Sequence, residues 1–363
     1  VPSTLGLHPT YTDGLVLICE PFWMAMLSVA CTGLGLAVLV TCSSYFVGGW
    51  AAVRFSRRKN MRLPDLTGFV FIVTGGNRGI GLLVVERLAA AGATVVMCAR
   101  CPGALREQTA CRLRDGGANI HCMELDLASL DSIAAFATAV RAKFTRLDGL
   151  VLSAGIAKSM QDSAGFATTQ HGFEECIGVN FLGHFALTQQ LLPLLRATQG
   201  ARVVAVTSVA SANTYTSGID YASWHTRVPH YEDWAQYGQS KLALILFVEQ
   251  LQEREPSLLA VACHPGVAET ELTTAGSCLD TVYSRAVYGL LAMRIEHAAL
   301  NVLHCATASG LLPGVLYHPI GRSGFKTHWF QRLGALQAPV AVNTEHADLW
   351  QRATDEIEHA RHR

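Results

Sequence analysis

The chain has 363 residues, half of them hydrophobic, which is enough for one large α/β domain or two smaller ones. Its 28 basic and 28 acidic side chains balance, so no overall positive field attracts nucleic acid, and we expect no nucleic-acid partner. The eleven cysteines lack the regular spacing of a disulfide-stapled secreted module, which indicates reduced thiols in a cytosolic environment.

The first feature along the chain is a long uncharged segment. No charged residue occurs over the 33 positions of 21–53, whereas a bilayer core needs about 20 helical residues. Trp23 and Trp50 lie 27 positions apart, or about 40 Å of helix, which matches a bilayer with its headgroup zones. We therefore predict a short N-terminal tail (1–20) and a transmembrane anchor (21–53).

Basic residues follow this segment at once. The first Lys or Arg is Arg54, and a basic linker covers 54–65, so the positive-inside rule places the following domain in the cytosol. A cleaved signal peptide, the alternative, would carry its positive charge ahead of the apolar run. We expect this membrane to be that of the endoplasmic reticulum. The chain begins with Val1 rather than Met, which indicates a trimmed or incomplete N-terminus.

A glycine-rich turn comes next. The apolar run 69–73 predicts a buried strand that leads into Thr74-Gly-Gly-Asn-Arg-Gly-Ile-Gly81, and apolar residues recur at helical spacing after it. Gly75, Gly79 and Gly81 would let the backbone approach a pyrophosphate at the helix N-terminus. A purely structural turn is the alternative.

Arg100 indicates which nicotinamide nucleotide the chain would bind. It ends the predicted strand 94–98, nineteen residues past Gly81, where an enzyme that uses NAD would carry Asp or Glu. An arginine accommodates a 2′-phosphate instead, and Arg78 in the glycine turn adds a second guanidinium. We predict NADP(H); the alternative is that Arg100 is only a solvated charge.

Strands and helices continue to alternate. The runs 122–127 and 147–155 each follow a helix-like segment, and 202–208 is another apolar run that ends in hydroxyls, which together predict βαβ units and a doubly wound parallel sheet. Asp126 could meet an adenine, with a helix N-cap as the alternative. Asn180 lies inside an apolar-faced helix, where a buried amide requires partners. Ser208 ends a buried strand, where ligand-facing groups gather.

Tyr237 and Lys241 lie one helical turn apart, on one face. A phenol titrates near ~10, so acid–base catalysis at neutral pH requires a fixed positive charge, which Lys241 would supply. A solvated helix pair is the alternative. The Cys98–Cys101 C-x-x-C has no second pair or histidine cluster to complete a zinc site, so no metal is expected.

The segments 213–236 and 272–294 are predicted to form the substrate cleft and its lid. An apolar pocket could be lined by Tyr215, Tyr221, Trp224, Tyr231, Trp234, Tyr283, Tyr288 and Met293, although such aromatics are often core residues. The C-terminal tail (331–363) contains a predicted helix over 343–360, capped by Asn343, with Leu349 and Trp350 on its inner face.

In order, these motifs resemble the short-chain dehydrogenase/reductase family over about residues 66–330. The motifs are Thr-Gly-x-x-x-Gly-Ile-Gly, Asn, Ser, Tyr-x-x-x-Lys and Pro-Gly. The long gap between Ser208 and Tyr237, the run 239–247, and His264-Pro-Gly-Val with Thr270-Glu-Leu are similar to its retinol-dehydrogenase-like branch. The resemblance implies a single Rossmann-type domain, often anchored to a membrane.

The resemblance also implies a role for each matched residue. Tyr237 would be the general acid or base, and Lys241 would lower its pKa and hold the ribose. Ser208 would orient the carbonyl, and Asn180 would hold a water that carries protons onward from Lys241. The expected cofactor contacts are Gly75, Asn77, Arg78, Gly79, Ile80, Gly81, Arg100, Asp126, Leu127, Ala154, Gly155, Tyr237, Lys241, Pro265, Gly266, Val267 and Thr270.

One motif departs from the family. The usual Asn-Asn-Ala-Gly is replaced by Leu152-Ser153-Ala154-Gly155, which removes two amides that brace the sheet beside the cofactor. Ser153 retains one hydrogen-bond donor. We expect a small loss of nucleotide affinity and less effect on catalysis.

The sequence therefore predicts a membrane-anchored NADP(H)-dependent oxidoreductase for a hydrophobic alcohol or carbonyl, such as a retinoid, a steroid or a lipid-derived aldehyde. The alternative is a nucleotide-binding membrane protein with a scaffolding or regulatory role. The expected partners are this small molecule and the lipid bilayer. A homo-oligomer is common in the family, but an anchored chain can also be a monomer.

Overall fold

The computed structural model describes residues 61–100, 119–157, 166–212, 214–215, 217–266, 294–317, 335–336 and 348–361. The predicted anchor (21–53) lies outside these ranges. Within them, no helix is both long and apolar enough to cross a membrane.

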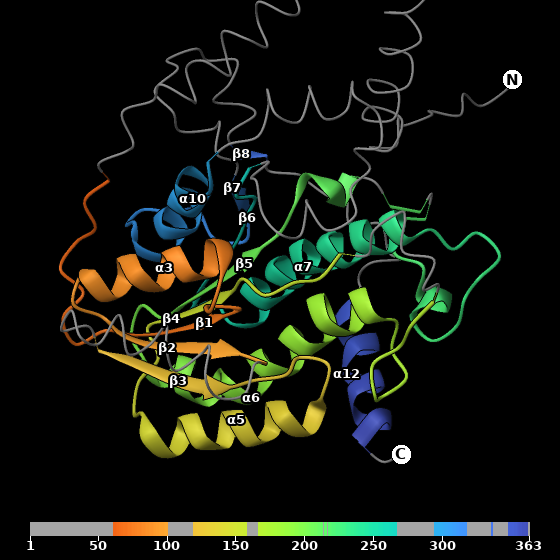
Figure 1. Ribbon diagram of the computed structural model, residues 1–363, viewed down its shortest axis with the longest axis horizontal. Coiled ribbons are helices and arrows are strands. Elements are labelled where there is room, and N and C mark those ends of the chain that lie inside the picture. The colour runs from red at the N-terminus through yellow and green to blue at the C-terminus, as the bar shows by residue number, and fades with distance from the viewer. Residues whose placement is uncertain are drawn as a thin grey trace, which may run out of the picture.

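A mainly parallel sheet forms the centre of the described part (Figure 1). Its strand order is β3-β2-β1-β4-β5-β6-β7-β8, and only β8 runs antiparallel to its neighbour. Short runs rich in Val, Ile and Ala form these strands because both faces of a parallel sheet are covered. The strands are β1 (Val70–Thr74), β2 (Thr94–Ala99), β3 (Ile120–Glu124), β4 (Gly149–Leu152), β5 (Arg202–Val206), β6 (Leu259–Cys263), β7 (Leu316–Tyr317) and β8 (Ala335–Leu336).

Helices cover both faces of the sheet, as the alternating pattern predicts. α3 packs against α10 on one face, whereas α5, α6 and α7 lie on the other (Figure 1). The helices are α3 (Gly79–Ala90), α5 (Leu130–Lys143), the π-helix η2 (Ile177–Leu182), α6 (Gly183–Ala197), α7 (Asp233–Arg254), α10 (Ile295–Thr307) and α12 (Leu349–Arg361), with the 3₁₀ turns η3 (Val209–Ala212) and η4 (Tyr221–Trp224).

Alternate residues of each strand enter different cores. In β1, Val70 and Ile72 pack toward α5, α6 and α7, whereas Phe71 and Val73 pack toward α3 and α10. The period-two alternation of a strand places its side chains on opposite faces. The sheet is thus the middle of three layers, and the predicted doubly wound Rossmann-type domain is confirmed.

The strand order reverses direction between β1 and β4. Moving outward, β2 and β3 extend the sheet on one side of β1, and β5 and β6 extend it on the other side of β4. In open α/β sheets, ligands bind beside the carboxyl ends of the strands at such a switch point. The predicted site residues should therefore meet at this edge.

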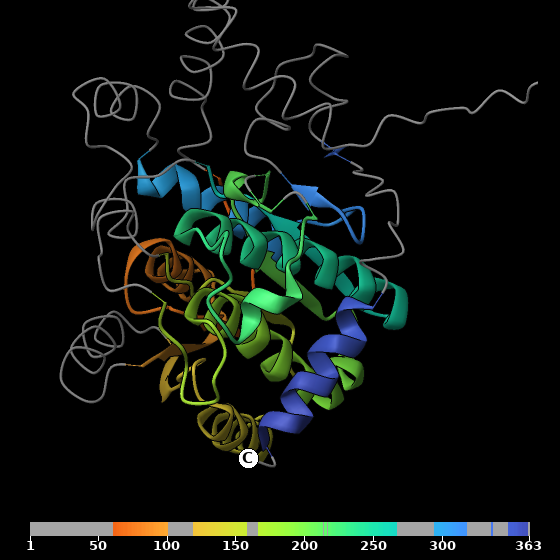
Figure 2. The ribbon, with the colours of Figure 1, turned by 90° about the vertical axis from the view of Figure 1, so that its right-hand side faces the viewer.

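The C-terminal helix α12 belongs to the same folded unit. It lies against α7 (Figure 2). The Trp350 ring contacts Phe185 of α6 and Phe247 of α7, with centroids 5.0 and 5.9 Å away. The predicted helix over 343–360 is confirmed from Leu349 onward, with Leu349 buried on its inner face. Asn343, its predicted cap, lies outside the described residues.

Candidate active site

The glycine-rich turn joins β1 to α3 and packs on the end of β4. Gly75 and Gly79 have φ values of 65° and 59°, in the left-handed region that glycine tolerates best. A Cβ on Gly75 would lie 2.9 Å from the Ala154 Cα, so a side chain there would separate the turn from β4. A Cβ on Gly79 would meet only Ile295 Cδ1, at 4.0 Å, which leaves open space outside the turn.

The start of α3 is suited to an anion. The Arg78 side chain does not cap the helix, and no acidic residue lies in the first turn. Helix N-terminal N–H groups favour negative charge, so this turn could hold a phosphate. The structure brings six predicted cofactor residues together here: Gly75, Asn77, Arg78, Gly79, Ile80 and Gly81.

Two exposed arginines lie at this edge of the sheet. The Gly76 N–H donates to the Cys98 carbonyl (3.1 Å), which holds the turn beside the end of β2. Arg100 directly follows β2, and both it and Arg78 in the turn are exposed. A phosphate beyond the end of β2 could therefore be met by one guanidinium or both.

Asp126 lies after β3 and closes a local turn. Its Oδ1 accepts a hydrogen bond from Ala128 N at 3.0 Å. The N-cap of α5 is Ser129, whose hydroxyl accepts from Ser132 N, so capping is not the role of Asp126. Leu127 beside it is buried.

The end of β4 is held by Thr74. Its hydroxyl accepts the N–H groups of Ser153 at 2.9 Å and of Ala154 at 3.0 Å. A Cβ on Gly155 would lie 3.2 Å from Lys241 Nζ and 3.3 Å from Asn180 Oδ1. The end of β4 therefore reaches the predicted catalytic residues.

Asn180 is fully buried in the π-helix η2, and its amide has the partners that a buried amide requires. Its Oδ1 accepts from Ile156 N (2.8 Å), and its Nδ2 donates to Ile156 O (2.9 Å) and to Ser240 Oγ (2.9 Å). These bonds join the segment after β4 to α7. A π-turn inside a helix is frequent at functional sites.

Tyr237 and Lys241 occupy one face of α7, directed toward the end of β5. The Lys241 Nζ lies 5.7 Å from the Tyr237 ring centroid and donates to the Val206 carbonyl at 3.1 Å. The two residues are only 6% and 5% exposed, so the alternative of a solvated helix pair is wrong. Ser208, two residues after β5 ends, forms a hydrogen bond with Tyr237.

Burial dominates the protonation of this pair. It raises the pKa of Tyr237 to about 12, against a lowering effect from the Ser208 hydrogen bond. It also lowers the pKa of Lys241 to about 8. The net shift of the Tyr237 pKa is therefore opposite to the one expected from Lys241, because desolvation of a phenolate outweighs the nearby positive group.

The last predicted contacts follow β6. Pro265 is buried, and Gly266 has a φ of 100°, a turn conformation suited to glycine. Val267 and Thr270, which complete this motif, lie outside the described residues, as does most of the predicted lid (272–294).

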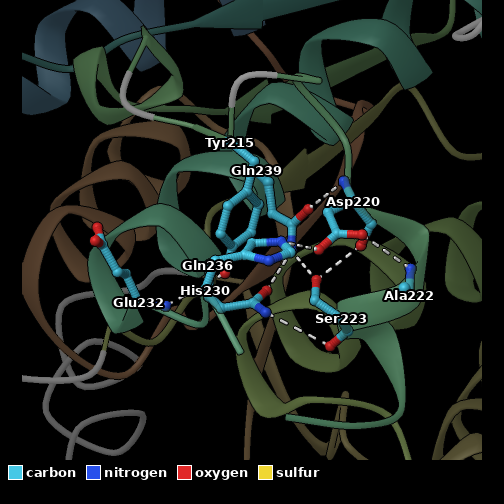
Figure 3. Close-up of polar contacts among 8 residues, drawn as sticks. All are labelled: Tyr215, Asp220, Ala222, Ser223, His230, Glu232, Gln236 and Gln239. Atoms are coloured by element: carbon cyan, nitrogen blue, oxygen red, sulfur yellow. Dashed lines mark hydrogen bonds and ion pairs between the residues drawn. The ribbon is translucent and has the colours of Figure 1, made fainter. Parts of the chain in front are cut away.

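The aromatic segment before Tyr237 is organised by a buried polar network (Figure 3). The Gln239 side chain accepts from Asp220 N (3.0 Å) and donates to Ser223 Oγ (2.9 Å), and Ser223 Oγ donates to Asp220 O (2.7 Å). Gln236 receives a further hydrogen bond from Gln239. These bonds fasten η4 to α7.

Three of the described aromatics of this segment have other contacts. Trp224 is 1% exposed and packs against Phe181, so its predicted place in the pocket is wrong. The Tyr221 hydroxyl donates to Asp348, the residue before α12 (3.0 Å), and that of Tyr231 to Asp233 (3.0 Å).

Two further aromatics of this segment lie at or near the start of α7. Trp234 is 38% exposed and lies beside Tyr237, with ring centroids 5.4 Å apart. Tyr215 is partly buried and packs edge-on against His230. Tyr283, Tyr288 and Met293 lie outside the described residues.

His184 is a site residue that the sequence reasoning missed. Its imidazole is fully buried between Thr74 and the Asn180 carbonyl. The available signal was its spacing, because a residue four positions after Asn180 lies on the same helical face.

Comparisons with known proteins agree with this geometry. A family model described as short chain dehydrogenase matches residues 70–225. The chain is 37% identical to mouse (Mus musculus) polyprenol dehydrogenase over 258 residues, 69% of this chain and 74% of the relative. It is 33% identical to human (Homo sapiens) retinol dehydrogenase 13 over 299 residues, 80% of this chain and 84% of the relative.

A solved structure shows the same fold. The RhlG/NADP active-site complex of Pseudomonas aeruginosa superposes with a TM-score of 0.56 at 26% identity, covering 71% of this chain and 97% of that one. The order of motifs, the sheet topology and the relatives agree. The chain belongs to the short chain dehydrogenase family, in its retinol-dehydrogenase-like branch, and is an oxidoreductase.

Proposed function

We propose that this chain is a membrane-anchored NADP(H)-dependent enzyme that transfers hydride between the nicotinamide and a hydrophobic alcohol or carbonyl. The substrate class we favour comprises retinoids, steroids and lipid-derived aldehydes. The bound cofactor would supply or accept the hydride. The residues of this chain would bind and orient the substrate and would move the proton.

The observation that carries the proposal is the cluster formed by the buried Tyr237 and Lys241 with the partly buried Ser208. With a pKa of about 12, Tyr237 holds its proton at neutral pH and is poised as a general acid toward a carbonyl oxygen. Ser208 can donate to the same oxygen and stabilise its developing negative charge. The protonated phenol is the form that acts in the reductive direction, which is the direction we favour.

The choice of NADP(H) is supported by the two arginines. Arg100 occupies the place after β2 where NAD enzymes would be expected to carry a carboxylate, and Arg78 lies in the neighbouring turn. The P. aeruginosa complex with a similar fold contains NADP. The residues at the glycine turn fit the pyrophosphate, since the turn leaves space at Gly79.

A hydrophobic substrate is supported by the exposed Trp234 ring beside Tyr237. The two relatives are named for their alcohols, polyprenol and retinol, and both of these alcohols are lipophilic. The predicted anchor (21–53) would hold the enzyme at the endoplasmic reticulum membrane, where such substrates dissolve. A nucleotide-binding scaffold, the alternative role, would not require the buried arrangement of Asn180, Tyr237 and Lys241.

The proposal is tested by turnover of the full chain in detergent. We would measure oxidation of NADPH and of NADH with retinal, steroid ketones and aliphatic aldehydes of increasing length. Tyr237→Phe should abolish turnover while NADPH binding remains. Tyr221→Phe is the matched control, because its hydroxyl contacts α12 instead, and it should retain activity. A Tyr237→Phe variant with full turnover would refute the proposed acid.

Cofactor preference is a separate prediction. Arg100→Asp should reduce the NADPH over NADH preference by at least ten-fold, because a carboxylate repels the 2′-phosphate and accepts from a 2′-hydroxyl. The ratio of kcat/KM for the two nucleotides measures it, with Arg141→Asp, on the distant helix α5, as a charge-matched control. An unchanged ratio would remove Arg100 from the nucleotide site.

A further inference from the structure

His184 connects two parts of the site that are far apart in the sequence. Its Nδ1 lies 2.8 Å from the Asn180 main-chain oxygen, and its Nε2 lies 2.9 Å from the Thr74 hydroxyl. No part of the residue is exposed to solvent. The imidazole therefore bridges the π-helix η2 and the end of β1.

The partners determine where the protons lie. A carbonyl oxygen only accepts, so the proton must be on Nδ1, which donates to Asn180 O. Burial, together with the nearby Lys241, lowers the pKa of His184 to about 4, so the ring is neutral and Nε2 is an acceptor. The opposite tautomer would place a bare Nδ1 lone pair against the carbonyl oxygen at 2.8 Å.

The same assignment orients Thr74. Its single hydroxyl proton is donated to His184 Nε2 at 2.9 Å rather than to the more distant Val151 carbonyl oxygen at 3.4 Å, which leaves its oxygen lone pairs for the N–H groups of Ser153 and Ala154. A hydroxyl can donate once and accept twice, so this arrangement uses its full capacity. A continuous chain of hydrogen bonds then runs from the Asn180 carbonyl to the end of β4.

These hydrogen bonds lie at the end of β4, where Leu152-Ser153 replaces the two amides of the family motif. The backbone of Ser153 and Ala154 is nevertheless held through Thr74. A Cβ on the following Gly155 would lie 3.2 Å from Lys241 Nζ and 3.3 Å from Asn180 Oδ1. Because the packing is this close, a movement of this backbone would displace Lys241 and Asn180.

We propose that His184 is a positioning residue: as the neutral Nδ1–H tautomer, it sets the distance between the Asn180 turn and the Ser153–Gly155 wall of the cofactor site. It contacts neither nicotinamide nor substrate and acts through Asn180 and Thr74. This role rests on the proposed function, because that wall is assigned to a nicotinamide nucleotide.

A double-mutant cycle in the full chain tests the link. His184→Phe removes both hydrogen bonds, and Thr74→Val removes the hydroxyl with little change of shape. Each should weaken NADPH binding and lower kcat/KM about ten-fold, whereas the double variant should be no worse than either single variant. Effects that multiply to about a hundred-fold would show independent roles and overturn the proposal. Thr74→Ser keeps the hydroxyl and should restore near wild-type binding.

The tautomer is tested without turnover. Nitrogen-15 NMR of the histidine side chains should show one ring protonated on Nδ1 that does not titrate between pH 6 and 8, and its signal should vanish in His184→Asn. An Nε2–H ring, or one that titrates in this range, would overturn the assignment. If this signal and the coupling in NADPH binding are found but no substrate reacts, the proposed hydride transfer fails, whereas the nucleotide site and the positioning role of His184 stand.

Discussion

At the scale of single residues, the site buries a phenol and an ammonium and shifts the pKa of each away from its ordinary value. Tyr237 and Lys241 are both buried, and desolvation penalises the charged form of each. The phenol is thereby kept protonated and the ammonium is weakened. At pH 7 the neutral phenol pays no such cost, whereas the charged Lys241 does, so Lys241 is the side chain that should lower stability while it serves activity.

Replacing Lys241 should show this trade. A fall of its pKa from 10.5 to about 8 corresponds to about 3 kcal/mol of destabilisation below pH 8, which is relieved as the pH rises toward 10.5. The sign follows because the unfolded chain binds the proton more tightly than the folded one. Lys241→Met also loses the bond to the Val206 carbonyl, so we expect a net gain of about 2 kcal/mol at pH 7.

Urea unfolding of wild type and Lys241→Met at pH 7 and pH 9.5 measures this difference. The gain should shrink at the higher pH, and turnover should be lost at both. A variant less stable than wild type at pH 7 would mean that Lys241 is better solvated or paired than its burial implies.

Much of the proposed catalytic group could be located from the sequence residue by residue, because each member comes from a spacing that the backbone enforces. Tyr237 and Lys241 are one helical turn apart, and Ser208 follows a strand end. The pKa direction of Tyr237 could not be predicted, since it depends on burial by distant segments. Nor could the bond between His184 and Thr74, which joins positions 110 residues apart.

At the scale of elements, α6 lies very close to the segment that follows β3. Gly183 is the first residue of α6, and a Cβ there would lie 2.3 Å from the Leu127 carbonyl oxygen and 3.0 Å from the Leu127 Cβ. Backbone atoms cannot move aside as a flexible side chain can. The glycine therefore fixes how near this helix lies to the sheet.

Gly183→Ala should lower the free energy of unfolding by about 2 kcal/mol, the usual cost of forcing a methyl group into packed backbone. Because Leu127 belongs to the predicted nucleotide site, the KM for NADPH should rise as well. Thermal unfolding with and without NADPH checks both effects. An unchanged melting temperature would show that α6 can shift at no cost.

The elements themselves were predicted well, but the role of the segment before α7 was not. Its aromatic composition indicated a pocket, whereas Trp224 fills the core and Gln239 binds the backbone of Asp220. Composition does not distinguish an aromatic that faces a cleft from one that packs inward. That depends on which polar groups anchor the turn, and here the anchors come from α7 itself.

At the scale of the whole molecule, one three-layered domain carries the complete set of described site residues. The alternation of apolar runs with helical segments was sufficient to predict this architecture. The π-helix was not predictable in the same way, because it differs from an α-helix only in its hydrogen-bond spacing. The anchor and the lid remain predictions from composition.

Membrane attachment is tested on the full chain in cells. We expect it to stay in the membrane fraction after alkaline carbonate extraction, since an uncharged segment of 33 residues exceeds the bilayer core. In sealed microsomes, added protease should digest the catalytic domain without detergent. Protection until detergent is added would place the domain in the lumen and contradict the orientation predicted from the basic linker.

The position of α12 has a consequence for the order in which the enzyme is completed. Tyr221 and His225, in the segment before α7, bind Asp348 and Glu356, and Arg352 lies over the Tyr221 ring. α12 is synthesised after every other described element, and a domain generally folds as a unit. The segment beside Tyr237 therefore receives its last supports only when translation has passed this helix.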